Sequence, residues 1–342
     1  MSPELSFADL SVLVARVVPH TVATVHALLR DGARVTIGAD LDDLPTSLRD
    51  LVERGLVAVE PDAEPETFDV VLRADVSTSP SPPVGPATDE EAHEAGGRSS
   101  VGTVTLLGGG LGDPGLLTVA GIEAIRAADV IVHDRLAPLS ALRHARDDVR
   151  VIDVGKIPRG DFTPQERINE ILVEHALAGR NVLRLKGGDN FVFGRGGEEA
   201  EACTAQGIPV VVLPGISSSI AAPALAGIPV THRTLVQGFT VVSGHVPPGD
   251  PRSTLDWGAI SRSGTTVVVL MGVATLGAIA ETLVAEGRSP LTPAAVVADA
   301  GLPSMRTVRA PLAEIDAAAR REGLGAPAVV VIGDVAALDV TR

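Results

Sequence analysis

Two glycine-rich segments, each lying between a strand pattern and a helix pattern, constrain the fold most. They read GGGLGDPG over residues 108–115 and KGGDNFVFGRGG over residues 186–197. Glycine permits backbone conformations and close approaches that other residues exclude, so a single loop of this kind fits either a ligand site or a tight strand-to-helix turn, and two together favour a ligand. The surrounding strand and helix patterns alternate, which predicts an α/β fold with a largely parallel sheet over residues 103–213.

Residues 77–100 divide the chain into parts of different character. This segment is rich in Pro, Ser, Gly and acidic residues and has no apolar period, which is typical of a flexible linker. Residues 1–76 predict a small α/β unit with a thin core, so we expect it to be docked or only marginally stable alone. Residues 101–213 and 214–342 predict two further α/β lobes.

Composition narrows the classes of partner. The net charge of −15, without a basic run or an aromatic platform, disfavours nucleic acid. A single cysteine, Cys203, excludes an internal disulfide and a cysteine-clustered metal site, so we expect no metal and a cytoplasmic protein. The N-terminus has no export pattern, and the uncharged stretch 208–230 contains four prolines that would break a membrane helix. We therefore expect no membrane association.

The first glycine segment has two possible ligands. Residues 110–115 match G-x-G-x-x-G, and Asp134 stands where a dinucleotide fold places its ribose-binding acid. Against that interpretation, Asp113 would repel a pyrophosphate and Pro114 lacks an amide donor. Two glycine loops that each carry an acid instead favour a nucleoside with a cationic group, such as S-adenosyl-L-methionine.

Several long motifs in the chain resemble the tetrapyrrole methylase family, and within it the uroporphyrinogen-III C-methyltransferases. The resemblance covers residues 102–338 and rests on GGGLGDPGLLT, ADVIVHDRL, VGKIPRGDFTPQERINEIL, RLKGGDNFVFGRGGEEAEA, VLPGISSSIAAPALAGIPVTHR and VVVLMGV. It implies a two-lobed, homodimeric methyltransferase. Such enzymes move two methyl groups from S-adenosyl-L-methionine to C2 and C7 of uroporphyrinogen III, giving precorrin-2 for sirohaem or cobalamin and S-adenosyl-L-homocysteine as by-product.

The resemblance also implies roles for particular residues. By this resemblance, the residues expected to contact the cofactor lie in the two glycine segments, in the serine segment and in the C-terminal lobe. They are Leu111, Gly187, Gly188, Asp189, Val192, Ser217, Ser218, Met271 and Gly301. Proton handling falls on Asp134 and Lys156, because a methylated pyrrole carbon leaves a cationic ring that must lose a proton. Substrate contacts fall on Arg195, Glu198 and Arg233, since arginine holds carboxylates through two parallel hydrogen bonds. Without the resemblance, Met271 also fits ordinary core packing and Asp134 a solvated charge.

The chain departs from the family pattern in two regions. Leu302 and Met305 replace hydrogen-bonding side chains near the expected cofactor wall. Residues 1–76 are similar to the start of a precorrin-2 dehydrogenase and sirohaem synthase module, but residues 15–17 read Ala-Arg-Val where that module has glycines. Because a pyrophosphate needs those glycines, we expect a degenerate Rossmann-like unit that binds no NAD and is a structural remnant.

Three alternative functions remain open from the sequence. One is methylation of a later corrin precursor by the same fold. Another is an NAD-dependent oxidoreductase of sirohaem synthesis, which the G-x-G-x-x-G match favours. The third is an inactive scaffold that binds a tetrapyrrole, which the departures at residues 302 and 305 favour.

Overall fold

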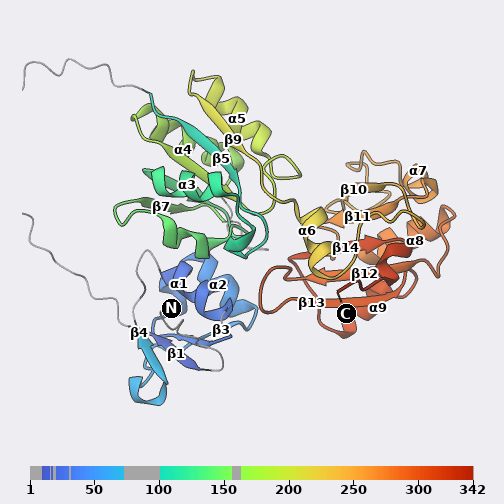
Figure 1. The fold of residues 1–342 in the computed structure, drawn as a ribbon, viewed down its shortest axis with the longest axis horizontal. Coiled ribbons are helices and arrows are strands. Elements are labelled where there is room, and N and C mark those ends of the chain that lie inside the picture. Colours follow the sequence, from blue (N-terminus) through green and yellow to red (C-terminus); the bar gives the residue numbers. More distant parts are fainter. Residues whose placement is uncertain are drawn as a thin grey trace, which may run out of the picture.

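The computed structural model describes residues 10–15, 17, 21–30, 32–72, 101–155 and 163–341. These residues form three β-sheets with helices packed against them (Figure 1). The expected linker 77–100 and Lys156 lie outside the described residues. One sheet falls within each of the three predicted units. We call residues 10–72 the first unit, residues 101–213 the N-terminal lobe and residues 214–341 the C-terminal lobe; these boundaries stay predictions.

The first unit has a four-stranded parallel sheet with two helices. Its strand order is β3 (Val57–Val59), β2 (Arg34–Ile37), β1 (Ser11–Val14) and β4 (Val70–Leu72), and its helices are α1 (Thr21–Arg30) and α2 (Thr46–Glu53). Just beyond β1, the amide of Ala15 donates to the carbonyl of Leu72 at 3.1 Å. The chain thus stays paired with β4 at the position where a dinucleotide-binding fold turns through glycines.

The N-terminal lobe confirms the predicted parallel sheet. Its order is β7 (Arg150–Asp153), β6 (Val130–His133), β8 (Val182–Lys186), β5 (Val104–Gly108) and β9 (Val210–Leu213), with helices α3 (Val119–Ala127), α4 (Gln165–Leu177) and α5 (Gly196–Thr204). Strands β5 and β8 are neighbours although they lie far apart in the sequence. Because they are parallel, both glycine segments leave the sheet at the same edge, where α/β folds bind ligands.

The C-terminal lobe has a mixed sheet. Its order is β10 (Phe239–Ser243), β11 (Thr266–Leu270), β14 (Ala328–Ile332), β12 (Pro293–Ala298) and β13 (Arg306–Pro311), and only β10 and β11 pair in parallel. Helices α6 (Ser218–Leu225), α7 (Trp257–Arg262), α8 (Leu276–Ala285) and α9 (Ile315–Arg321) complete it. The apolar pattern did not predict β13, because this edge strand carries two arginines and is only half-buried.

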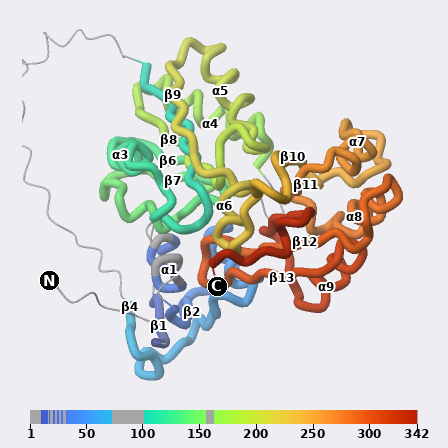
Figure 2. Tube along the Cα trace, turned by 45° about the vertical axis from the view of Figure 1, so that its right-hand side comes forward, coloured from blue at the N-terminus to red at the C-terminus, as the bar shows by residue number. Residues whose placement is uncertain are grey.

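The first unit shares its core with the N-terminal lobe. One buried cluster joins Val25 and Leu28 of α1 to Ile125, Leu139 and other residues of the lobe. Helix α1 packs against the 3₁₀ segment Leu139–His144. Figure 2 shows the first unit beneath the N-terminal lobe and beside the C-terminal lobe. The unit is therefore docked, as its thin core predicted.

Among the described residues, no helix combines the length and the apolar character that crossing a membrane requires.

Burial of Cys203 gives a direct test of the N-terminal lobe. The side chain is fully buried between α5 and the sheet, and burial, aided by the negative charge of Glu199, raises the pKa of its thiol to about 11. Since only the thiolate reacts readily, we expect iodoacetamide at pH 8 to label the native protein far more slowly than the urea-unfolded protein. Intact mass spectrometry measures both rates, and equal rates would contradict the burial.

Candidate functional site

The two glycine loops are joined by their backbones. Gly110 donates to the carbonyl of Gly188 at 3.1 Å, and Gly188 donates back to Gly110 at 2.7 Å. A third glycine packs against them, because a Cβ on Gly215 would lie only 2.4 Å from the carbonyl oxygens of Gly108 and Gly188. A larger residue at position 215 would push these segments apart, and Gly110 and Gly188 have positive φ values of 69° and 68°, which favour glycine.

Two polar side chains fix the second loop. Asp189 accepts the amide of Phe191 at 2.9 Å through one carboxylate oxygen and the amide of Gly215 at 3.2 Å through the other. A carboxylate has more than two acceptor positions, so Asp189 can still accept from a ligand. Asn190 is fully buried and its amide donates to one carbonyl of β5 and one of β9, both at 3.0 Å. This asparagine thus ties the loop to the sheet.

Serines and a glycine of the C-terminal lobe approach the same loops. Ser217 caps α6 by accepting the amide of Ser219 at 3.3 Å. The hydroxyl of Ser218 lies 3.2 Å from the position that a Cβ on Gly188 would occupy. Gly301 of the C-terminal lobe lies so close to the first glycine loop that a Cβ added to it would be 2.4 Å from the carbonyl oxygen of Leu111. Residues predicted to bind cofactor thus come together from both lobes.

Unfavourable backbone conformations occur in the second glycine segment and at two positions of the C-terminal lobe. Among the described residues, the non-glycine residues with positive φ are Phe193, Arg195, Met271 and Asp299. Each such residue costs on the order of 1–3 kcal/mol and persists where the surroundings enforce it, often at a functional site. Met271 is also 50% exposed, which argues against the core-packing interpretation and leaves its side chain available to a ligand.

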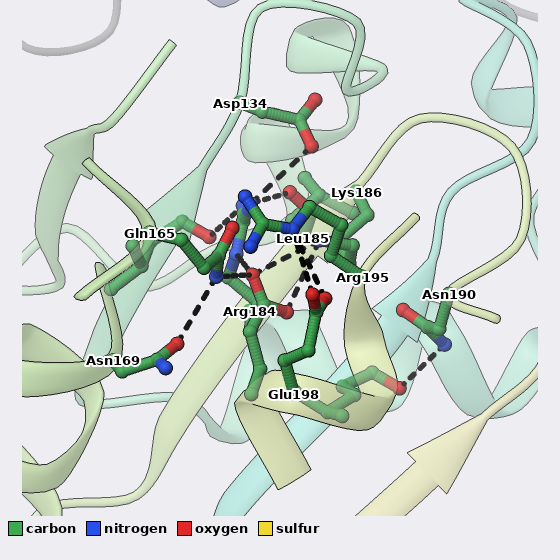
Figure 3. Close-up of polar contacts among 12 residues, drawn as sticks. Asp134, Gln165, Asn169, Arg184, Leu185, Lys186, Asn190, Arg195 and Glu198 are labelled. Atoms are coloured by element: carbon green, nitrogen blue, oxygen red, sulfur yellow. Dashed lines mark hydrogen bonds and ion pairs between the residues drawn. The ribbon is translucent and has the colours of Figure 1, made fainter. Parts of the chain in front are cut away.

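Asp134 stands at the end of β6, beside these loops (Figure 3). One carboxylate oxygen accepts the amide of Leu136 at 3.0 Å, and the other lies 3.5 Å from the guanidinium of Arg184. The side chain is 29% exposed. The carboxylate is therefore oriented by the protein and still accessible, as a proton acceptor must be. Lys156, the second proposed proton-handling residue, lies outside the described residues.

A buried ionic cluster lies behind Asp134, and the sequence pattern did not predict it. Glu199 is fully buried and accepts from Arg184 at 3.0 Å, from Lys186 at 3.0 and 3.1 Å, and from Gln165 at 3.3 Å (Figure 3). Burial lowers the pKa of Lys186, as does the neighbouring Arg184, while Glu199 opposes the shift. The sequence signal for this cluster was the alternation of Arg184 and Lys186 with leucines in strand β8. Because side chains alternate between the two faces of a strand, this spacing puts both cations on one face of a buried sheet.

The predicted substrate residues are exposed. Arg195, at the start of α5, donates to both carboxylate oxygens of Glu198 at 3.1 Å, and both side chains are about half exposed. Arg233 is exposed beyond α6. The structure thus brings Arg195 and Glu198 together as expected, and the roles of all three residues stay predictions.

Within the described ranges, no group of three or more His, Cys, Asp or Glu side chains is arranged to hold a metal ion.

A family model described as "Tetrapyrrole (Corrin/Porphyrin) Methylases" matches residues 103–316. The chain belongs to this family. A uroporphyrin-III C-methyltransferase from Thermus thermophilus, solved with S-adenyl homocysteine, is 38% identical, has a TM-score of 0.58 and is matched over 68% of this chain and 98% of its own. The tetrapyrrole methylase fold is thus established for the two lobes.

Curated relatives include enzymes of two lengths. An S-adenosyl-L-methionine-dependent uroporphyrinogen III methyltransferase from Methanosarcina barkeri is 45% identical over 234 residues, which are 68% of this chain and 92% of the relative. A siroheme synthase from Neisseria meningitidis is 46% identical over 237 residues, 69% of this chain but 48% of the relative. The chain therefore matches about half the length of such siroheme synthases.

The buried cluster predicts unequal roles for two adjacent glutamates. Glu199→Gln would leave Arg184 and Lys186 buried without their shared counterion, so we expect it to lower the free energy of unfolding by about 3–5 kcal/mol. Glu198→Gln removes an exposed pair and should cost at most about 1 kcal/mol. Urea unfolding followed by circular dichroism compares the two variants, and similar losses would show that the buried cluster has no special weight.

Proposed function

We propose that this protein is an S-adenosyl-L-methionine-dependent methyltransferase that converts uroporphyrinogen III to precorrin-2 by methylating C2 and C7. The observation that supports it most strongly is the pair of glycine loops joined at Gly110 and Gly188, beside an oriented Asp134, in a chain of this family. The relatives named above, one of them solved with the demethylated cofactor, support the choice of cofactor and substrate.

The residues at the loops fit this cofactor. A nucleoside that carries an amino acid needs close backbone approach and a few polar contacts, which Gly187, Gly188 and the serines of α6 offer. Met271 offers an exposed, polarisable side chain at a strand end, suited to packing on adenine or near sulfur. When bound, S-adenosyl-L-methionine supplies an electrophilic methyl group. The protein's main contribution is then alignment of that group with the substrate carbon.

Asp134 is proposed to accept the proton that the methylated pyrrole ring releases. Its backbone hydrogen bond and the nearby guanidinium of Arg184 hold the carboxylate in one orientation. Arg184 is in turn held by Glu199, so the base rests on a buried and rigid support. Lys156 stays a proposed second proton carrier.

Arg195, Glu198 and Arg233 are proposed to bind the substrate. Uroporphyrinogen carries acetate and propionate arms, which two exposed guanidiniums can hold despite the negative net charge of the chain. The existing contact between Arg195 and Glu198 holds the arginine side chain near the loop that also contains Asp189. Substrate and cofactor would then be bound by opposite ends of one segment.

The dinucleotide alternative fits the first loop less well. The carboxylate of Asp113 accepts the amide of Gly115 at 2.8 Å, so the donor that a pyrophosphate would need is already used. Membership in the methylase family also disfavours an oxidoreductase.

We further propose a cytoplasmic homodimer that binds neither nucleic acid nor a membrane. Exposed apolar side chains near α6 and the second glycine loop, such as Phe191, Ile220 and Leu225, support a surface that a second copy covers.

Activity is tested with purified protein, uroporphyrinogen III and S-adenosyl-L-methionine under anaerobic conditions. We expect a product that has gained two methyl groups, identified by mass spectrometry, together with S-adenosyl-L-homocysteine. Absence of methylation beside an active reference enzyme would refute the proposal. Methylation of a later corrin precursor, but not of uroporphyrinogen III, would favour the first alternative.

The two ends of the second glycine segment should separate kinetically. Arg195→Ala removes a charged hydrogen bond to substrate, so we expect the KM for uroporphyrinogen III to rise about 10-fold or more. Asp189→Ala releases the loop that holds the cofactor, so it should chiefly weaken S-adenosyl-L-homocysteine binding in calorimetry. If both variants impaired cofactor affinity alone, the proposed division of the segment would be wrong.

A further inference from the structure

Helix α2 of the first unit contacts both lobes through two charged side chains one helical turn apart. Asp50 accepts from Arg135 of the N-terminal lobe at 2.7 Å, and Arg54 pairs with Asp299 of the C-terminal lobe. Asp50 and Arg54 also lie 3.5 Å apart. The four residues form a continuous ionic chain from one lobe to the other, through a unit that is not part of the matched methylase region.

This ionic chain is largely shielded from water. The side chains of Asp50, Arg54, Arg135 and Asp299 are between 10% and 18% exposed. Ion pairs on an open surface contribute little, whereas removing one partner of a desolvated pair leaves an uncompensated charge. Breaking either pair would therefore leave a shielded charge without its partner.

Both end points of the chain adjoin the proposed active site. Arg135 directly follows Asp134, and the next residue, Leu136, packs its carbonyl against Gly187. Asp299 lies two residues before Gly301 and has a positive φ of 53°. Its second carboxylate oxygen accepts the hydroxyl of Ser304 at 2.9 Å, so the ion pair also anchors the turn over residues 299–304.

An apolar contact beside the ion pairs explains one departure from the family pattern. Leu29, Leu51 and Leu56 of the first unit line a small pocket together with Leu302 and Pro303. On its other side Leu302 reaches the first glycine loop, since a Cβ on Gly112 would lie 2.6 Å from its side chain. A leucine at position 302 thus suits a turn that is covered by the first unit.

We propose that the first unit is an intramolecular clamp on the methyl-transfer site, and that Asp50 and Arg54 are positioning residues which hold its two loops. This inference rests on the proposed function for the identity of the ligand. It replaces the expectation of a passive remnant with a defined task, namely to hold the turn 299–304 against Leu111 so that the cofactor loops are preformed. A preformed site binds its ligand more tightly because less ordering is needed.

The test compares Arg54→Met with Glu53→Gln in the full chain. Glu53 is the adjacent, exposed residue of α2, so its variant removes a charge from the same helix without touching either lobe. We expect Arg54→Met to raise the Kd for S-adenosyl-L-homocysteine about tenfold in calorimetry and to raise amide hydrogen exchange of residues 299–305, while Glu53→Gln matches wild type. Arg54→Lys, which keeps the charge, should restore most of both properties.

The readouts distinguish this inference from the proposed function. A wild-type protein that does not bind S-adenosyl-L-homocysteine would refute the proposed function, but the exchange experiment would still test the clamp because it needs no ligand. Unchanged exchange at residues 299–305 in Arg54→Met would overturn the clamp. If Arg54→Met does not fold, Asp299→Asn, which removes the same ion pair and keeps the shape of the side chain, replaces it with the same criteria. A purely structural role would lower the melting temperature without changing Kd or local exchange in the folded protein.

Discussion

The backbone contact between Gly110 and Gly188 is the constraint on which the rest of the site depends. It joins two loops that leave neighbouring parallel strands, and the backbone of Gly215, just before α6, packs against Gly108 and Gly188 beside this contact. Beside these joined segments, Ser218 lies next to Gly188 and the carboxylate of Asp189 accepts the amide of Gly215. Packing of backbone on backbone thus brings together the residues that are proposed to bind the cofactor.

Ionic interactions of two kinds surround this surface. Glu199 is fully buried and pairs with Arg184 and Lys186 of β8. Arg184 in turn lies 3.5 Å from the carboxylate of Asp134 and helps to orient it. Arg195 and Glu198 are about half exposed and pair with each other, and they are proposed to contact the anionic substrate. Adjacent glutamates in one helix therefore serve different purposes because one side chain points into the sheet and its neighbour points to solvent.

The first unit is a small α/β sheet that packs on the N-terminal lobe. Directly after β1, the amide of Ala15 donates to the carbonyl of Leu72 in β4. Its apolar face is covered by the N-terminal lobe, and its helix α2 carries the charges that reach both lobes. Such docking also supplies the surface that a unit with a thin core needs for stability.

The sequence by itself determined the parallel N-terminal sheet, the two glycine segments and the family, because strand periodicity and glycine spacing are local properties. It also selected Arg195 and Glu198, which are three residues apart at the start of α5, as candidate substrate residues. Only the tertiary structure decided that Glu199 is a buried counterion, that Asn190 joins β5 to β9, and that Arg54 meets Asp299. Each of these contacts joins segments that are far apart in the sequence. Residue type and local spacing do not specify which distant segments become neighbours in the fold.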